Sequence, residues 1–210
     1  MLIALSLLIT RRFWSTALSG SLTCTGQPRP SELILVENFE PEYLLFERAA
    51  ALREEGFAAR VLVPIQISQA SRAANTASVE TAKLLAQLAH LRGPEFLPIR
   101  AAEPINLNTA YELRDFLAKE HLKSVVVVTS GFRSKRASLV YEAVLARSGV
   151  AVSCVPVFVG AGPHNWSQSW HGIEEVTQQF FKLQFYRFYV LMKPRRSTRR
   201  AECAQEDCES

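Results

Sequence analysis

Four consecutive valines, Val125 to Val128, constrain the fold of this chain more than any other stretch. β-Branched side chains favour extended backbone, because their crowded Cβ restricts side-chain rotation in a helix. The run is apolar at every position rather than at every second one, so both faces of the strand must be covered. Strands of that kind lie in parallel sheets between two layers of helices. The valines therefore predict a central strand of an α/β domain.

Short β-branched runs alternate with longer helical patterns along most of the chain, which is the order expected of repeated βα units. We expect strands at Leu33–Val36, Arg60–Ile67, Phe96–Arg100, Ser124–Thr129 and Ala151–Val157. We expect helices at Glu42–Glu55, Asn75–Arg92, Leu107–His121, Ser134–Arg147 and Gly172–Met192. Gly56 and Gly149 stand where the C-terminal turns of two of these helices are expected. The sequence thus predicts a three-layer, Rossmann-like α/β domain with a mostly parallel central sheet of about five strands.

The basic excess of the chain lies at its two ends. The formal net charge is +4, but acidic and basic side chains balance between Ser31 and Met192. This distribution argues against nucleic acid as a partner, because a nucleic-acid-binding face needs clustered cations. We expect the α/β domain to cover residues 31–192 and a disordered tail, first basic and then acidic, to cover residues 193–210.

The first ten residues, MLIALSLLIT, are apolar but cover only about half of the ~20 residues that a membrane-spanning helix needs. The segment lacks the basic start of a secretory signal, and Arg11 and Arg12 follow it. We expect residues 1–30 to be a membrane anchor whose beginning is missing from this reading frame, with a short stiff linker into the domain. The protein would then be associated with the inner membrane. The alternative is a frayed amphipathic extension.

The four cysteines are too few and too scattered to predict a disulfide framework. Cys154 lies in an apolar run and is predicted to be a packed thiol, whereas Cys203 and Cys208 lie in the polar tail. His164 and His171 are the closest pair of histidines, and no cysteine or carboxylate joins them at a ligand spacing. We therefore expect no metal site.

Polar residues follow three of the predicted strands, at the edge of the sheet where ligands bind in doubly wound α/β proteins. They are Glu37 and Asn38 after the first strand, Glu103, Asn106, Asn108 and Thr109 after the third, and Thr129, Ser130, Gly131, Arg133 and Arg136 after the fourth. Arginines at the start of a helix break the usual preference for acidic residues there. A helix start with small residues and one or two arginines is typical of a seat for a phosphate or a carboxylate. We expect Arg136 to be the main anion-binding side chain and Arg133 an auxiliary one.

Simpler interpretations of these residues stay open. The arginines could point into solvent or pair with an acidic residue such as Glu37, Glu80 or Glu103. Asn108 and Thr109 could cap the next helix, because Thr109 to Glu112 fits a capping box.

The run TSGFRSKRA, from Thr129 to Ala137, resembles the Thr-Ser-x-x-His-x-x-Arg-Ala motif of the bacterial YdcF/SanA/ElyC-like family, a domain-of-unknown-function group. Three further segments occur in that family's order: Ser78 to Ala82 with Glu80, Ile99 to Glu103, and Asn108 with Thr109. The resemblance covers residues 31–189. It implies a Rossmann-like domain, often with an amino-terminal membrane anchor, that serves envelope biogenesis. It also implies S-adenosylmethionine or a nucleotide as a ligand.

The chain departs from the family motif in two places. Arg133 stands where the family has histidine, and an arginine stays protonated at ordinary pH and so cannot act as a general acid or base. Glu37 and Asn38 stand in the place of a glycine-rich turn, which removes the close backbone approach that glycine allows. The sequence therefore leaves open whether the protein is an enzyme.

The last predicted helix carries aromatic residues on more than one face, so it must be buried or lie against a membrane. Trp166, Trp170 and His164 precede it and are expected to rim the crevice or to be ordinary core and loop residues. We expect an uncharacterised envelope-associated protein that binds a small anionic ligand: a nucleotide, S-adenosylmethionine or a phosphorylated envelope intermediate. A membrane surface is a second expected partner, because a basic segment follows the helix. The alternative is a non-catalytic envelope biogenesis factor that binds a protein partner.

Overall fold

A computed structural model describes residues 13–67, 76–100 and 102–192 of the chain. Its centre is a five-stranded sheet in the order β3-β2-β1-β4-β5, and every neighbouring pair of strands is parallel. The strands are β1 (Leu33–Val36), β2 (Arg60–Ile67), β3 (Glu95–Arg100), β4 (Ser124–Ser130) and β5 (Ala151–Val157). The predicted α/β class and parallel sheet are confirmed.

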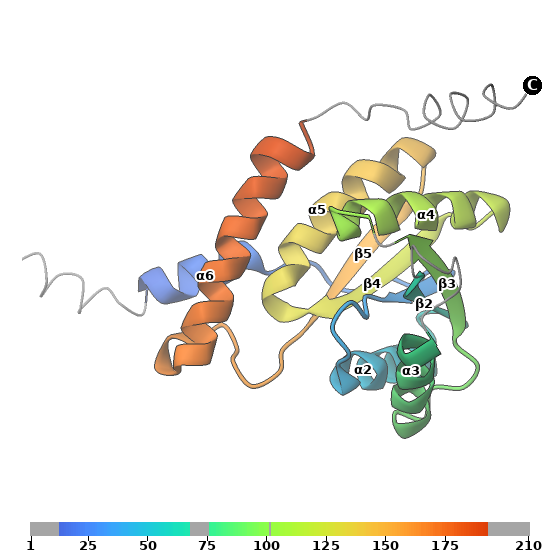
Figure 1. Cartoon of the computed structure of the whole chain (residues 1–210), viewed down its shortest axis with the longest axis horizontal. Coiled ribbons are helices and arrows are strands. Elements are labelled where there is room, and N and C mark those ends of the chain that lie inside the picture. The colour runs from blue at the N-terminus through green and yellow to red at the C-terminus, as the bar shows by residue number, and fades with distance from the viewer. Residues whose placement is uncertain (1–12, 68–75, 101, 193–210) are drawn as a thin grey trace, which may run out of the picture.

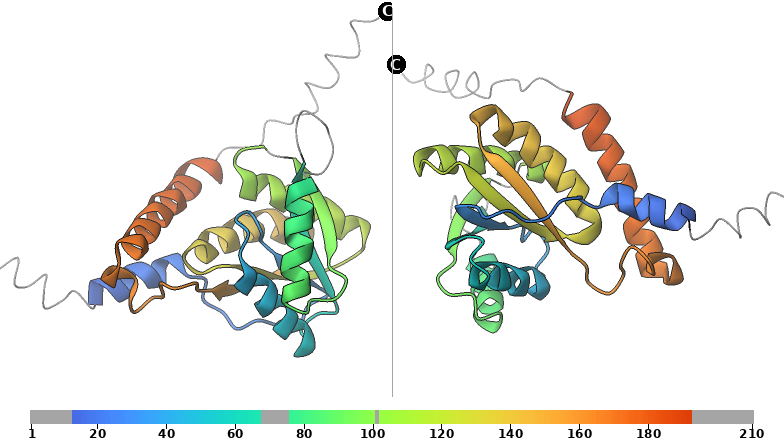
Figure 2. Two further views of the ribbon diagram at one scale, coloured as in Figure 1. Left: turned by 60° about the horizontal axis from the view of Figure 1, so that its bottom comes forward. Right: turned by 180° about the vertical axis from the view of Figure 1, so that it is seen from behind.

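Helices cover both faces of the sheet (Figure 1). One layer contains α2 (Tyr43–Glu54) and α3 (Thr76–Leu88), and the other contains α4 (Ile105–Lys119) and α5 (Ser134–Leu145). Short 3₁₀ turns precede and follow α5, at η1 (Gly131–Arg133) and η2 (Ala146–Ser148). A further 3₁₀ turn, η3 (Trp166–Gln168), leads into α6 (Trp170–Phe185), which continues as a π-helical turn, η4 (Tyr186–Val190). Among these elements, α6 lies at one end of the molecule, away from β2 and β3 (Figures 1 and 2).

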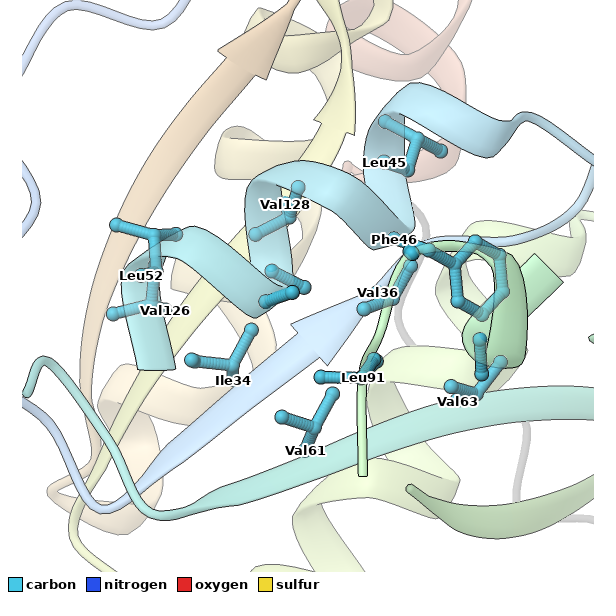
Figure 3. Close-up of a cluster of buried hydrophobic side chains, with 14 of the residues drawn as sticks. Ile34, Val36, Leu45, Phe46, Leu52, Val61, Val63, Leu91, Val126 and Val128 are labelled. Atoms are coloured by element: carbon cyan, nitrogen blue, oxygen red, sulfur yellow. The ribbon is translucent and has the colours of Figure 1, made fainter. Parts of the chain in front are cut away.

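The valines of β4 are buried on both faces, as their sequence predicts. Val126 and Val128 pack with Ile34 and Val36 of β1 against α2 and α3, where their side chains meet those of α2 (Figure 3). Val125 and Val127 face the other way, into the cluster formed with α4 and α5. Each such side chain contributes about 1.5–3 kcal/mol on burial.

Two predicted helix ends are confirmed by backbone geometry. Gly56 after α2 and Gly149 after η2 have φ angles of +81° and +71°. Glycine has no Cβ to clash in this left-handed conformation, so the chain can turn sharply out of the helix and into the next strand.

The described N-terminal residues pack on α6. A helix that includes residues 13–22 crosses α6 (Figures 1 and 2), and Leu22 is fully buried with Trp166, Val176 and Leu183. The indole Nε1 of Trp166 donates a hydrogen bond to the carbonyl oxygen of Ser15 at 3.1 Å. Residues 13–24, which the sequence analysis assigns to the anchor and linker, thus contribute Leu22 and Cys24 to the hydrophobic core, while Phe13 and Trp14 are exposed.

A disulfide joins Cys24 to Cys154 of β5, with 6.3 Å between their Cα atoms. The prediction that Cys154 is a packed thiol is therefore wrong. The two cysteines are 130 residues apart in sequence, and only the return of the N-terminal segment to β5 brings them together. The backbone N–H of Cys24 also donates a hydrogen bond to Ser134 Oγ at 2.9 Å. The N-terminal segment is therefore bound covalently to β5 and by a hydrogen bond to the start of α5.

In the part of the chain that the structure describes, no helix is long and apolar enough to cross a membrane. The apolar run of residues 1–10 and the tail of residues 193–210 lie outside the described residues.

Candidate functional site

A cleft of about 370 Å³ opens at the carboxyl ends of β1 and β4. The chain leaves β1 toward β2 on one side and leaves β4 toward β5 on the other, so the connecting segments part at this point of the sheet. In open α/β sheets, ligands bind where the connections diverge in this way. The cleft is lined by Glu37, Glu40, Pro41, Glu42 and Leu45 after β1; Ser130, Gly131 and Arg133 after β4; Phe158, Val159 and Ala161 after β5; and His171, Glu174, Glu175, Gln178 and Gln179 of α6.

Glu37 is the buried carboxylate of the cleft, with 3% of its surface exposed. One carboxylate oxygen accepts hydrogen bonds from Asn106 Nδ2 at 2.7 Å and from the Tyr141 hydroxyl at 3.4 Å. The other oxygen accepts a short hydrogen bond from the Thr129 hydroxyl. Burial, together with the Glu37 carboxylate, raises the pKa of Tyr141 well above its usual value, so the phenol stays a donor. Three donors from α4, β4 and α5 thus offset the loss of water around this charge.

Arg133 supplies the positive charge of the cleft. Its guanidinium forms an ion pair with Glu40, and the Arg133 side chain is 13% exposed whereas that of Glu40 is 75% exposed. The hydrogen bond from Arg133 lowers the pKa of Glu40, and partial burial opposes that shift. The pair is therefore asymmetric: the arginine is fixed in the wall, and its carboxylate partner is largely in water.

Arg136 lies behind this wall, with 7% of its surface exposed, and does not line the cleft. Its guanidinium carbon lies 5.3 Å from the centre of the Tyr186 ring, and its Nε has no hydrogen-bond partner in the structure as described. Burial lowers the pKa of Arg136, while the Glu37 carboxylate opposes that shift. Burial also raises the pKa of Tyr186 to about 12, although the nearby positive charge of Arg136 lowers that pKa. The structure therefore gives Arg133, rather than Arg136, the position that a bound anion would reach first.

The wall opposite β1 and β4 comes from α6, which the sequence did not assign to the site. His171, Glu175 and Gln178 recur at helical spacing on one side of α6, and Gln179 lies beside them. Burial raises the pKa of Glu175, and the nearby His171 opposes this shift. Gln179 is 3% exposed, and its Oε1 has no hydrogen-bond partner within the described residues. A ligand with a hydroxyl or amino group could satisfy that buried acceptor.

Gly131 makes room for an aromatic side of the cleft. A Cβ at this position would lie 2.2 Å from the Phe158 ring, which is closer than any packed contact allows. Phe158 in turn packs edge-on against Phe132, with 5.3 Å between the ring centres. The glycine that the sequence marked after β4 therefore serves close packing of the cleft wall.

The structure brings some of the predicted site residues together and separates others. Glu37, Ser130, Gly131 and Arg133 line the cleft, and Thr129 and Arg136 lie directly behind it. Glu80 lies on α3, where it pairs with Lys83, and Asn38 lines a separate cavity of about 240 Å³ with Ser78 and Thr81. Glu103 is exposed, does not line the cleft, and acts electrostatically on Lys182 and Tyr186.

Asn108 and Thr109 have structural hydrogen bonds: Asn108 joins α4 to the end of β3, and Thr109 bonds within α4. The helix begins at Ile105, four residues before Thr109, so the capping-box interpretation is wrong. Asn108 Nδ2 donates to the carbonyl oxygen of Arg100 at 2.8 Å, and the Thr109 hydroxyl donates to that of Ile105 at 2.8 Å. The residue of α4 that reaches the site is Asn106, near the start of the helix. Asn106 is one of the polar residues that follow the third predicted strand, and the structure buries it.

The α6 residues could have been found from the same kind of signal. The six aromatic residues of the last predicted helix lie between Phe180 and Tyr189, whereas polar residues recur at helical spacing before them, from His171 to Gln179. A polar stripe on an otherwise apolar helix indicates a surface that faces water or a ligand. Within the described ranges, no group of three or more His, Cys, Asp or Glu residues is arranged to hold a metal ion.

Neither the known protein-family models nor the curated proteins include a match to this chain.

Proposed function

We propose that the protein binds a small ligand with an anionic group in the cleft between β1, β4 and α6. The observation that carries the proposal is the cleft itself, which lies where ligands bind in open α/β sheets and combines Arg133 with the buried acceptor Gln179. Its volume of about 370 Å³ suits a molecule of the size of a nucleoside or an amino-acid derivative.

The anionic group would replace Glu40 on Arg133. An ion pair with so exposed a partner contributes only about 0–1 kcal/mol, so the exchange has a small cost. The hydroxyl of Ser130 lies on the same side of the cleft and offers a further donor. Arg136, behind the wall, adds positive potential without direct contact.

The rest of the ligand would be a hydrogen-bond donor or a cation. The described lining contains the carboxylates of Glu40, Glu42, Glu174 and Glu175 in addition to the saturated Glu37, against the single arginine. This balance disfavours a polyphosphate, which would meet several negative charges, and favours a zwitterion. S-adenosylmethionine combines a carboxylate with ammonium and sulfonium cations and ribose hydroxyls, so we propose it ahead of a nucleotide or a phosphorylated envelope intermediate.

We also propose an envelope role, as the resemblance to the YdcF/SanA/ElyC-like family implies. The Cys24–Cys154 disulfide supports a position in an oxidising compartment, because such bonds persist outside the cytosol. The proposal is one of binding rather than of a reaction, since Arg133 cannot exchange a proton in the place of the family's histidine. If no small ligand binds, the same cleft is proposed as the contact of a non-catalytic envelope factor with a protein partner.

Binding can be measured by calorimetry on the purified chain with S-adenosylmethionine, adenosine, ATP and inorganic phosphate as probes. We expect S-adenosylmethionine to bind more tightly than ATP, and Arg133→Ala to weaken that binding by about 10- to 150-fold, the effect of losing a charge-assisted hydrogen bond of about 1.5–3 kcal/mol.

The matched control is Arg147→Ala, which removes an arginine from the far end of the same helical segment and outside the cleft. The control should leave the affinity unchanged. Equal losses in both variants would mean that net charge attracts the ligand. Binding of none of the four probes would contradict the small-ligand proposal.

A further inference from the structure

An exposed apolar face runs along α6 and η4. Large side chains that are 38–78% exposed recur there from the first turn of α6 to the end of the described chain. We call this surface the aromatic face; it comprises Trp170, Ile173, Phe181, Phe185, Phe188, Tyr189 and Met192.

The aromatic face lies opposite the side of α6 that packs on the protein. Val176, Leu183, Tyr186 and Val190 are buried and recur at helical spacing. Phe181, Phe185, Phe188 and Met192 also follow at steps of three and four residues, but with the opposite phase. The helix is therefore apolar on two opposite sides, and the described protein covers one of them. An uncovered apolar surface of this extent marks an interaction site.

We propose that the aromatic face docks the protein on an anionic lipid bilayer. Aromatic side chains favour the boundary between lipid headgroups and acyl chains, and cations beside them are attracted to anionic lipids. Lys182 and Arg187 lie on α6 and η4, and the chain then continues with five cations between Lys193 and Arg200. The acidic residues of α6, Glu174 and Glu175, line the cleft instead.

The N-terminal residues support the same partner. The helix that includes residues 13–22 crosses α6, so the chain enters the described structure at the end of the molecule that carries the aromatic face (Figures 1 and 2). Phe13 and Trp14, at this entry point, are 70% and 60% exposed, and the apolar residues 1–10 precede them in the sequence. The exposed aromatic residues from both ends of the described chain therefore lie at one end of the protein.

The charges favour lipid over a second copy of the chain. Two aromatic faces brought together would also bring together Lys182 and Arg187 of the two copies, and like charges repel. An anionic bilayer instead gains from each of these cations. This inference does not depend on the ligand of the cleft, because the α6 residues that line the cleft lie between His171 and Gln179, whereas the aromatic face lies mostly beyond them, from Phe181 to Met192.

The test is co-sedimentation of the full chain with vesicles that contain phosphatidylglycerol and with vesicles of phosphatidylcholine alone. We expect binding to the anionic vesicles to exceed binding to the neutral ones. We expect Phe181→Ser combined with Phe188→Ser to lower the partition coefficient by about ten-fold or more, because two exposed rings no longer enter the interface. The matched control is Leu84→Ser with Leu88→Ser, which removes two similarly exposed apolar residues from α3.

The contribution of residues 1–10 is separated by repeating the comparison in a chain with Leu5→Asp and Leu8→Asp. The phenylalanine pair should lower vesicle binding in that background too. Phe181 and Phe188 are 67% and 72% exposed, so their replacement should leave the unfolding temperature unchanged and the fold intact.

Three results would overturn the inference. The phenylalanine variant could bind anionic vesicles as well as the unaltered chain does. The α3 control could lose as much binding as the phenylalanine variant. Sedimentation equilibrium could show a dimer that the phenylalanine variant abolishes while vesicle binding is absent, which would assign the aromatic face to a second copy.

Discussion

Glu37 and Arg136 are opposite charges buried within one site, and they are stabilised by different means. Glu37 has three hydrogen-bond donors, whereas Arg136 lies over an aromatic ring with its Nε unpartnered in the described structure. Glu37 also opposes the effect of burial on the pKa of Arg136. The Glu37 carboxylate therefore accepts hydrogen bonds from three donors and also stabilises the buried cation of Arg136.

Replacing Glu37 tests this dependence. Glu37→Ala leaves Asn106 and the hydroxyls of Thr129 and Tyr141 without their acceptor and removes the opposite charge from Arg136. We expect a loss of about 3–5 kcal/mol in the free energy of unfolding, measured by urea denaturation. Glu80→Ala, which removes an exposed carboxylate paired with Lys83, should cost less than about 1 kcal/mol. Equal effects would show that the Glu37 network does not stabilise the fold.

Glu175 should act in the opposite direction. Because burial raises its pKa in the folded chain, the ionised carboxylate destabilises the fold at pH values above that raised pKa. We expect Glu175→Gln to stabilise the protein at pH 7 by up to about 1 kcal/mol, since the half-buried group is still partly solvated. The gain should shrink as the pH falls through the raised pKa, and should vanish below the usual pKa of about 4.3.

Thermal unfolding of Glu175→Gln between pH 4 and pH 7 measures this effect, with the exposed neighbour Glu174→Gln as the control. A loss of stability in Glu175→Gln at pH 7 would mean that the interaction with His171 outweighs burial. Stabilisation would indicate that the cleft keeps a charge that the fold does not need, which is common at binding sites.

The bounds of individual helices and strands match the predicted bounds closely where the pattern of apolar residues continues over the whole element. β1, β2 and β5 have the predicted bounds, and the ends of α2 and α5 differ from prediction by one or two residues. The start of α4 was missed because buried Asn106 and Thr109 are polar, and polar residues before a helix look like caps. The predicted strand ends placed Glu37, Ser130 and Arg133 at the carboxyl edge of the sheet, where all three line the cleft.

The α6 wall could not be placed in the same way. No local pattern fixes which side of the molecule a final helix covers after a long connection such as that from Val157 to Trp170. Its position depends on contacts of Leu22 and Trp166 that join opposite ends of the chain. The sequence also could not show that Arg133 lines the cleft while Arg136 is buried behind it, because both arginines begin the same helical segment and only tertiary packing distinguishes them.

The whole molecule is closed by the Cys24–Cys154 bond, which encloses all or part of every strand in one covalent loop. Such a bond restricts the unfolded chain, and its removal typically costs about 2–5 kcal/mol. We expect Cys24→Ser, Cys154→Ser and the double variant to lose similar amounts of unfolding free energy, because each breaks the same bond. Denaturant titrations of the three oxidised proteins measure this. Additive losses would show that the two sulfurs stabilise the protein separately.

The bond also sets the path of a mechanical load. A pull on the chain ahead of Phe13, resisted at the last described residue, Met192, passes from Cys24 directly to Cys154 and then along the second half of β5. The residues between the two cysteines carry no tension, so β1 is not peeled away from β2 and β4. Reduction of the bond would send the same force through β1 first, in the middle of the sheet and next to Glu37. Whether the cleft keeps its shape under tension therefore depends on two sulfur atoms.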